Sequence, residues 1–472
     1  MSAESYDDGT RGASRRGTRS YDVVVVGGGT GGAFAAATAA EAGLDTVLVE
    51  RKSAEDAGHI ACGDAIKGKN AFPDVVDLDY LREESFTNQR ITRAVFENPA
   101  DGETVDIPLG TTGAVLDRKR YGEVLLEEVD RLGVDLHFDT VVQDVVQEAD
   151  GTVTGVRATH DGDAVTYEAE VTVDAAGSLS ILQDKADFSR SRFDTNVSYS
   201  QFCSAYREVI DVEEPVDWDD ALVFKPTEEL GYLWYFPRSP TRINVGLGFQ
   251  MDKPPMKLVE ALRRDVKSRA EFAGATVVDK LGGALPTRRP YDSAVADGFV
   301  AVGDAAGHVN PTTGGGIPGA AKSAHWAMER VVEALSDGGA TEEALWSYNH
   351  DVMTDFGKKF AGIDLYNIWG SAHDVEDLTG VVTAVPGQQL ADALGRGTGS
   401  SMKLGLKLKT ALKTVGHWDT LSELYRVQRK AAEIRDHYDR YPQSPEAFDA
   451  WAEVRDGILE DVYAISGADP KY

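Results

Sequence analysis

The sequence predicts an α/β fold with an α+β insert and a helical C-terminal region. A run of β-branched residues at Val23–Val26 is followed at once by a glycine-rich turn and an alanine-rich helical segment. Between residues 193 and 285, most segments have the pattern of strands, with one helical segment at 257–269. After residue 340, helical spacing continues to the end of the chain. At 472 residues, the chain is long enough for two or three domains.

The composition excludes several classes of protein. Acidic residues outnumber basic ones by 78 to 48, which gives a net charge of −30, and such a surface repels nucleic acid. The acidic residues are spread along the chain, a distribution that resembles haloarchaeal proteins, whose charge keeps them soluble in high salt. The only two cysteines, Cys62 and Cys203, exclude a disulfide scaffold and a four-cysteine metal site. We therefore expect neither a metal nor a nucleic-acid partner.

The first motif with chemical meaning is a glycine turn directly after the strand at 21–26. Gly27, Gly29 and Gly32 have the spacing that allows a tight turn, close approach of a pyrophosphate, and packing of helix on strand. The helix that follows points its positive N-terminus at that phosphate, and a second strand ends at Glu50, a candidate acceptor for ribose hydroxyls. This order predicts a Rossmann-type dinucleotide-binding unit. Its expected contacts are Gly27, Gly29, Gly31, Gly32, Glu50, Arg51 and Val142.

A second motif favours FAD over NAD as the dinucleotide. A short apolar strand at 298–302 leads into Gly303-Asp304 and then into a glycine-rich turn and a helix from about residue 318. An aspartate at the end of such a strand can bind the ribityl chain of a flavin, and the amides at the start of the helix can face the flavin ring. The alternative is an ordinary strand, turn and helix with a capping aspartate. We expect the flavin end of the cofactor to contact Asp304, Gly315, Gly316 and Ile317.

From Tyr21 to Ser336 these motifs resemble the flavoproteins of the para-hydroxybenzoate hydroxylase-like fold. The segment 117–121 resembles the one whose arginine reaches the cofactor in that group, which implicates Arg118. The segment ending in Asp174 departs from the group's pattern, so a cofactor role for Asp174 is not carried over. The resemblance implies a discontinuous Rossmann-type FAD-binding domain with an inserted substrate domain. The predicted divisions are a disordered arm (1–20), the FAD-binding domain (21–192 and 286–338), a β-rich substrate domain (193–285) and a helical C-terminal region (339–472).

An aromatic strand suggests what the flavin acts on. Tyr232, Trp234 and Phe236 alternate and therefore share one face of a strand, and Gly246 and Gly248 follow. Core packing is the alternative for such a strip. The pattern is similar to Y-x-W-x-F-P…G-x-G in the geranylgeranyl reductase family. That resemblance implies an FAD-dependent reductase of the C=C bonds of geranylgeranyl chains in archaeal membrane lipid, with hydride from flavin N5 and the three aromatic residues positioning the chain.

Three other functions remain open at this point. Two are enzymes of the same fold, namely a side-chain reductase for a prenylated quinone and a flavin monooxygenase. The third is a lipid-binding protein that has kept FAD and lost catalysis.

The segment 58–64 resembles the Cys-Gly loop that lies near the flavin in the same family. This chain departs from the usual proline-containing approach, because Gly58-His59-Ile60 precedes the cysteine. The resemblance implies that Cys62 and Gly63 contact the flavin and that Cys62 takes part in the reaction. A free cysteine is otherwise a small buried hydrophobic residue. Cys62, His59 and an ordered water are candidates for the proton donor.

Two segments, one near the N-terminus and one in the C-terminal region, bear on cellular location and partners. No apolar segment follows Arg15-Arg16, so an export signal is not supported and we expect a cytoplasmic protein. Residues 402–415 carry four lysines and no acid, and their apolar residues share a helical face. We expect either peripheral contact with the inner face of an anionic membrane or packing on the chain's own acidic surface. No second Rossmann unit is evident, so ferredoxin and NAD(P)H both remain candidate electron donors.

Overall fold

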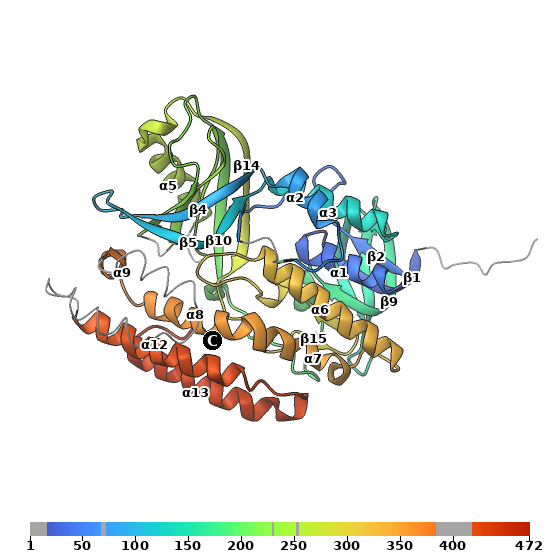
Figure 1. Ribbon diagram of the computed structural model, residues 1–472. Coiled ribbons are helices and arrows are strands. Elements are labelled where there is room, and N and C mark those ends of the chain that lie inside the picture. The colour runs from blue at the N-terminus through green and yellow to red at the C-terminus, as the bar shows by residue number, and fades with distance from the viewer. Residues whose placement is uncertain (1–16, 68–71, 229–230, 252–253, 384–417) are drawn as a thin grey trace, which may run out of the picture.

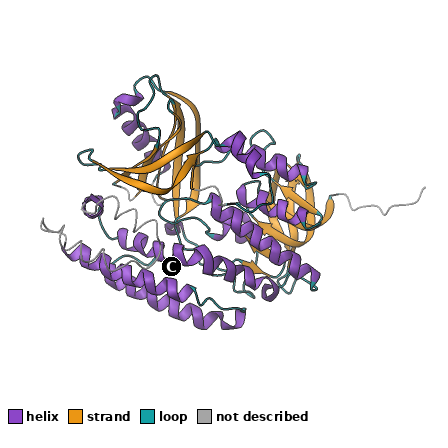
Figure 2. Cartoon of the chain, in the orientation of Figure 1, coloured by secondary structure: helices purple, strands orange, loops and turns teal. Residues whose placement is uncertain are grey.

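Two β-sheets organise the protein, and helices cover them (Figures 1 and 2). The computed structural model describes residues 17–67, 72–228, 231–251, 254–383 and 418–472. Mixed sheets with covering helices confirm the predicted α/β class. Within the described ranges, no helix combines the length and the apolar character that crossing a membrane requires.

The first sheet carries the glycine turn. Its strand order is β15-β16-β9-β1-β2-β6, with β7 and β8 joined to it through β9. The pairs β1–β2, β1–β9 and β9–β16 are parallel, so these strands end at the same edge of the sheet. The strands are β1 (Thr18–Val26), β2 (Thr46–Val49), β6 (Asp135–His137), β7 (Thr140–Gln147), β8 (Val153–His160), β9 (Asp163–Asp174), β15 (Val295–Ala296) and β16 (Phe299–Ala301).

Small and β-branched residues explain the close packing around β1. Val23–Val26 are almost fully buried, as a central parallel strand covered on both faces requires. The helix α1 (Thr30–Glu41) is rich in alanine and buried over most of its length, and it packs closely against α6 (Ile317–Ser336). One boundary differs from the prediction. Residues 18–20 were assigned to a disordered arm, but they belong to β1 and pair with residues 166–168.

The second sheet carries the aromatic strand and has the order β14-β10-β13-β12-β11-β4-β5-β3. Its first three strands along the chain come from residues 65–115, which the sequence analysis placed in the FAD-binding domain. They join the sheet because β4 pairs in parallel with β11, a long-range pairing that no local pattern reveals. The strands are β3 (Ala65–Lys67), β4 (Asn88–Glu97), β5 (Thr104–Val115), β10 (Phe202–Asp211), β11 (Ala221–Thr227), β12 (Gly231–Ser239), β13 (Arg242–Gln250) and β14 (Thr276–Pro286).

The two faces of β12 serve different purposes. Leu233 and Tyr235 belong to the apolar core that includes Leu258 and Leu262 of α5 (Pro255–Ser268). The intervening side chains, Tyr232, Trp234 and Phe236, belong to a separate small apolar cluster with Ile91 and Val115. The predicted alternation is therefore correct, and the aromatic face lies opposite the face covered by α5.

The C-terminal region is helical, as predicted, and lies along the bottom of Figure 1. The predicted basic segment 402–415 falls outside the described residues. The remaining helices of this region and of the rest of the chain are α2 (Leu78–Ser85), α3 (Arg118–Arg131), α4 (Ile181–Lys185), α7 (Glu342–Val352), α8 (Lys358–Gly370), α9 (Val375–Thr383), α12 (Trp418–Tyr438) and α13 (Phe448–Ser466).

The last two residues of the chain attach to α8 through a buried carboxylate. Lys471 Nζ lies 2.6 Å from Asp364 Oδ1, and the Tyr472 hydroxyl donates to Asp364 Oδ2. The Asp364 side chain is 1% exposed, so its charge depends on these partners.

Replacing Lys471 with Met should therefore lower the free energy of unfolding by about 3–5 kcal/mol, because it leaves a buried carboxylate without its cation. Urea denaturation measures the loss. Lys430→Met is the matched control: Lys430 pairs with the more exposed Glu433 and Asp461, and its loss should cost about 1 kcal/mol or less. Equal losses for the two variants would contradict this interpretation.

Candidate functional site

The glycine turn leaves room for a ligand where no side chain fits. Gly27 has a φ of 108°, and a Cβ there would lie 2.4 Å from the Ala175 carbonyl oxygen. A Cβ on Gly32 would lie 1.8 Å from the Gly27 carbonyl oxygen. Gly29 differs, because the nearest atom to its Cβ position is a side-chain carbon of Ile60 at 3.6 Å. The turn therefore packs tightly on its inner side and offers open backbone on its outer side, as a pyrophosphate requires.

Glu50 lies at the end of β2 beside this turn. Its buried carboxylate accepts hydrogen bonds from the amides of Gly28, at 2.7 Å, and Lys52, at 2.9 Å. Each oxygen retains lone-pair capacity for ribose hydroxyls. Arg51 is exposed next to it. Val142 lies on β7, the strand whose Thr140 amide donates to the Glu50 carbonyl oxygen.

Asp304 and the start of α6 meet at the carboxyl edge of the first sheet. A Cβ on Gly316, the N-cap of α6, would lie 3.2 Å from Asp304 Oδ1. Gly316 has no side chain to cap the first amides of the helix, so these amides can face a ligand. Gly315 accepts a hydrogen bond from the Asn310 amide at 3.1 Å, which holds the turn. Burial raises the pKa of Asp304 to about 6, and nearby Arg118 opposes the shift.

Arg118 connects the glycine turn with the segment that contains Cys62. It is the first residue of α3 and is 4% exposed. Its guanidinium donates to Thr30 Oγ1 at 3.3 Å and to the Gly58 carbonyl oxygen at 3.5 Å. A buried cation between two loops suits a pyrophosphate or an anionic ring system.

The Asp174 carboxylate is hydrogen-bonded to residues that closely follow it in the chain. Its carboxylate is fully buried and accepts hydrogen bonds from the Ala176 amide, Ser180 Oγ and Gln183 Nε2 at 2.8–3.1 Å. These contacts brace the chain after β9.

The aromatic side chains of β12 form a continuous wall. The Tyr232–Trp234 and Trp234–Phe236 ring centroids are 6.1 and 6.3 Å apart. At one end, the Tyr232 hydroxyl donates to the Thr313 carbonyl oxygen at 2.7 Å, in the turn before α6. At the other end, a Cβ on Gly63 would lie 3.0 Å from the Phe236 ring. The wall therefore connects the turn before α6 with the Cys-Gly segment.

The two glycines of the G-x-G pattern are cross-strand partners of the wall. Gly246 of β13 lies opposite Trp234, and Gly248 lies opposite Tyr232. A Cβ on Gly246 would lie 2.3 Å from the Trp234 ring, whereas the nearest atom to a Cβ on Gly248 is Cys203 Sγ at 3.3 Å. The glycine at 246 thus allows the indole to lie across the neighbouring strand.

Cys62 and Gly63 lie in the segment just before β3. Cys62 Sγ accepts a hydrogen bond from the Asp64 amide at 3.2 Å. Burial, followed by the charge of Asp64, raises the pKa of the Cys62 thiol to about 11. His59, the other predicted proton donor, lies 2.9 Å from Asp279, which also pairs with buried Arg207.

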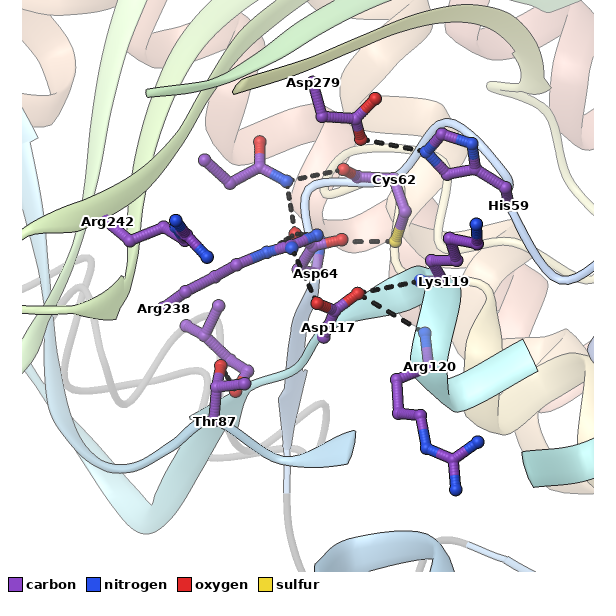
Figure 3. Close-up of polar contacts among 12 residues, drawn as sticks. His59, Cys62, Asp64, Thr87, Asp117, Lys119, Arg120, Arg238, Arg242 and Asp279 are labelled. Atoms are coloured by element: carbon purple, nitrogen blue, oxygen red, sulfur yellow. Dashed lines mark hydrogen bonds and ion pairs between the residues drawn. The ribbon is translucent and has the colours of Figure 1, made fainter. Parts of the chain in front are cut away.

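Three polar residues that were not among the predicted site residues hold this segment, namely Asp64, Arg238 and Asn244. Arg238, near the end of β12, lies between Asp64 and Asp117, the residue that caps α3 (Figure 3). Asn244 donates to the Cys62 carbonyl oxygen and to Asp64. Asn244 lies two residues before Gly246, and a search for polar residues on the aromatic face would have found it.

Replacing Gly246 with Ala should displace the Trp234 ring, because the new Cβ would lie 2.3 Å from a ring carbon to which it is not bonded. We expect lower stability and a changed Trp234 signal in near-ultraviolet circular dichroism. Gly248→Ala, on the same strand, should have a much smaller effect on both. A Gly246→Ala protein with the wild-type spectrum would show that the ring does not lie where the structure places it.

Comparisons with known proteins identify the family. Residues 22–230 match the family described as FAD dependent oxidoreductase. A digeranylgeranylglycerophospholipid reductase of Methanothrix thermoacetophila is 32% identical, over 72% of this chain and 85% of its own. The one from Sulfolobus acidocaldarius is 27% identical, over 93% and 98%. A solved geranylgeranyl bacteriochlorophyll reductase-like structure from Thermoplasma acidophilum is 21% identical, with a TM-score of 0.69 over 89% of this chain and all of its own, and supports the fold.

The site fits the cofactor that these comparisons name. The glycine cradle has no room for side chains at 27 and 32, and a buried arginine and an uncapped helix start lie beside it. The predictions of an FAD cofactor and of an oxidoreductase are confirmed. The chain belongs to the digeranylgeranylglycerophospholipid reductase family and is an FAD-dependent oxidoreductase.

Proposed function

We propose that the protein reduces the C=C bonds of geranylgeranyl chains in a membrane glycerophospholipid or its precursor. The observation that carries the proposal is the position of the aromatic wall, which contacts both the Cys-Gly segment and the turn before α6. An apolar surface there suits a hydrocarbon chain. The similar proteins of Sulfolobus acidocaldarius and Methanothrix thermoacetophila are digeranylgeranylglycerophospholipid reductases, which supports the same substrate.

The wall can hold an alkene and keep water away from it. Trp234 and Phe236 are 7% and 6% exposed, and Ile91 and Val115 of the same apolar cluster are fully buried. An isolated alkene has no polar group to orient it, so shape and contact with flat rings must do so. Exclusion of water also protects a reduced cofactor from side reactions.

Residues of the first sheet would hold the cofactor. When bound and reduced, FAD supplies a hydride, so that each double bond gains one hydride and one proton and becomes a single bond. Gly27 and Gly32 would shape the turn, Gly29 would let its backbone approach the pyrophosphate, and Glu50 would accept hydrogen bonds from the ribose hydroxyls. Asp304 would bind the ribityl chain, and the first amides of α6 would face the ring.

We assign the proton to the Cys62 thiol. Its raised pKa keeps it protonated at neutral pH, and Gly63 places the segment directly against the wall. His59 is less suitable, because Asp279 and Arg207 already engage its ring nitrogen.

The substrate assignment predicts a mass change. The purified protein, reduced anaerobically with dithionite and given digeranylgeranylglycerophospholipid, should return lipid heavier by two hydrogens for each bond reduced. A prenylated quinone, given separately under the same conditions, should return unchanged. Mass spectrometry reads both. Reduction of the quinone alone would contradict the lipid assignment, and an oxygenated product formed with O2 would indicate a monooxygenase.

The Cys62 assignment predicts a pH profile as well as a mutant effect. A donor with a pKa of about 11 is protonated below that value and loses its proton only above it, so the rate of lipid-dependent flavin oxidation should stay flat from about pH 6 to 9. Cys62→Ser should lower that rate by about 10²- to 10⁴-fold, the usual contribution of a positioned acid, and should retain FAD. A wild-type rate in Cys62→Ser would eliminate the thiol as donor.

We propose that the electron donor reaches the flavin without a dinucleotide-binding turn of its own in the described part of the chain. Within the described residues, the Gly27–Glu50 unit is the dinucleotide-binding turn, and FAD occupies it in this proposal. NADPH, NADH and reduced ferredoxin, each mixed with oxidised protein in a stopped-flow instrument, will identify the donor by the rate at which flavin absorbance bleaches.

A further inference from the structure

The Asn244 side chain connects the aromatic wall with the Cys62 segment. It lies on β13, opposite Phe236 and diagonal to Trp234, and it is fully buried. Its side-chain oxygen accepts a hydrogen bond from Trp234 Nε1 at 2.9 Å. Its side-chain nitrogen donates to the Cys62 carbonyl oxygen at 2.9 Å and to Asp64 Oδ2.

These three contacts join the two halves of the reaction site. The indole belongs to the wall, and the Cys62 carbonyl belongs to the segment that would contact the flavin. The Asn244 side chain has one carbonyl oxygen that accepts and two N–H groups that donate, which matches its three partners. Asp could accept from Trp234 but could not donate while ionised, and an aliphatic residue could do neither. The missing side chain at Gly246 opens the diagonal path along which Trp234 reaches Asn244.

Charged groups hold the amide from the other side. Asp64 Oδ2 accepts from Arg238 Nε and from Asn244, so the Asn244 amide nitrogen is oriented by a buried carboxylate. Arg238 in turn contacts Asp117 at 3.2 Å. On the far side of Gly246, Arg207 pairs with Asp279. With the carboxylate fixed in this way, rotation of the Asn244 amide would break all three of its hydrogen bonds.

We infer that Asn244 is a positioning residue that sets the Trp234 ring and the Cys62 segment at a fixed separation, and so places the alkene between them. This inference rests on the proposed function. Asn244 does not itself contact reacting atoms; it acts through Trp234 and the Cys62 carbonyl. Its loss should therefore slow the lipid-dependent step and leave the cofactor bound.

The test compares Asn244→Leu with Trp234→Phe, which keeps an aromatic ring on the wall but removes the indole N–H together with the rest of the five-membered ring. Lipid-driven oxidation of the dithionite-reduced flavin should slow by about 10- to 100-fold in Asn244→Leu, the range that a displaced reactant costs. Oxidation by O2 without lipid, FAD content and the unfolding midpoint should stay near those of the control. The double variant should be hardly slower than Asn244→Leu, because both changes break the same hydrogen bond.

Asn349→Leu is the matched control. Asn349 is also a buried amide, with hydrogen bonds to Ala294 and Ser293 just before β15, far in sequence from the wall. A wild-type lipid rate in Asn244→Leu, an equal loss in Asn349→Leu, or additive losses in the double variant would each overturn the inference.

The flavin spectrum separates this inference from the proposed function. Asn244→Leu and Trp234→Phe should shift the visible absorbance of oxidised FAD in the same direction without any lipid, since both alter what packs on the ring. If wild-type protein fails to reduce lipid and the shifts still appear, the substrate assignment fails and the positioning role stands. If the shifts are absent, the positioning role fails whatever the substrate is.

Discussion

The buried carboxylate of Asp64 holds the reaction site together. It is fully buried and lies in the left-handed backbone region at a φ of 69°, a conformation that aspartate tolerates better than most residues. A buried charge persists only when it is paired, and here the partner is Arg238, which comes from the second sheet. Arg238 also reaches Asp117, the cap of the helix that begins with Arg118. One carboxylate thus ties the Cys-Gly segment to the aromatic strand and to the arginine beside the cofactor cradle.

The two sheets contribute different parts of the proposed site. In the proposed site, the first would offer open backbone, a carboxylate and a helix start to FAD, and the second would place flat apolar rings beside it. Neither sheet alone forms a reaction site, because the chemistry needs an alkene held against a ring. Contacts between the two parts include the hydrogen bonds from Tyr232 to Thr313 and from Ser178 to Ala284, and the contact of His59 with Asp279. Changes at these points should therefore affect the reaction more than changes within either sheet.

Local patterns allowed the cofactor-binding motifs to be predicted. The glycine turn, Glu50 and the Asp304 turn are each confined to a short stretch, and the face shared by Tyr232, Trp234 and Phe236 follows from strand alternation. The cross-strand role of Gly246 depends on the register of β12 against β13, which alternation does not determine. The Asp64–Arg238 pair joins residues 174 apart in sequence, and β4 reaches β11 by a similarly long connection. Such contacts arise only when the whole chain is folded.

We propose that the flavin ring lies between the Cys-Gly segment and the start of α6, with the aromatic wall facing it. A crystal structure with FAD and a bound geranylgeranyl lipid tests this claim most directly. We expect an alkene carbon within about 3.5 Å of flavin N5 and in contact with Trp234. A flavin ring separated from the wall by protein, or a lipid chain bound on the α5 face of the second sheet, would contradict it.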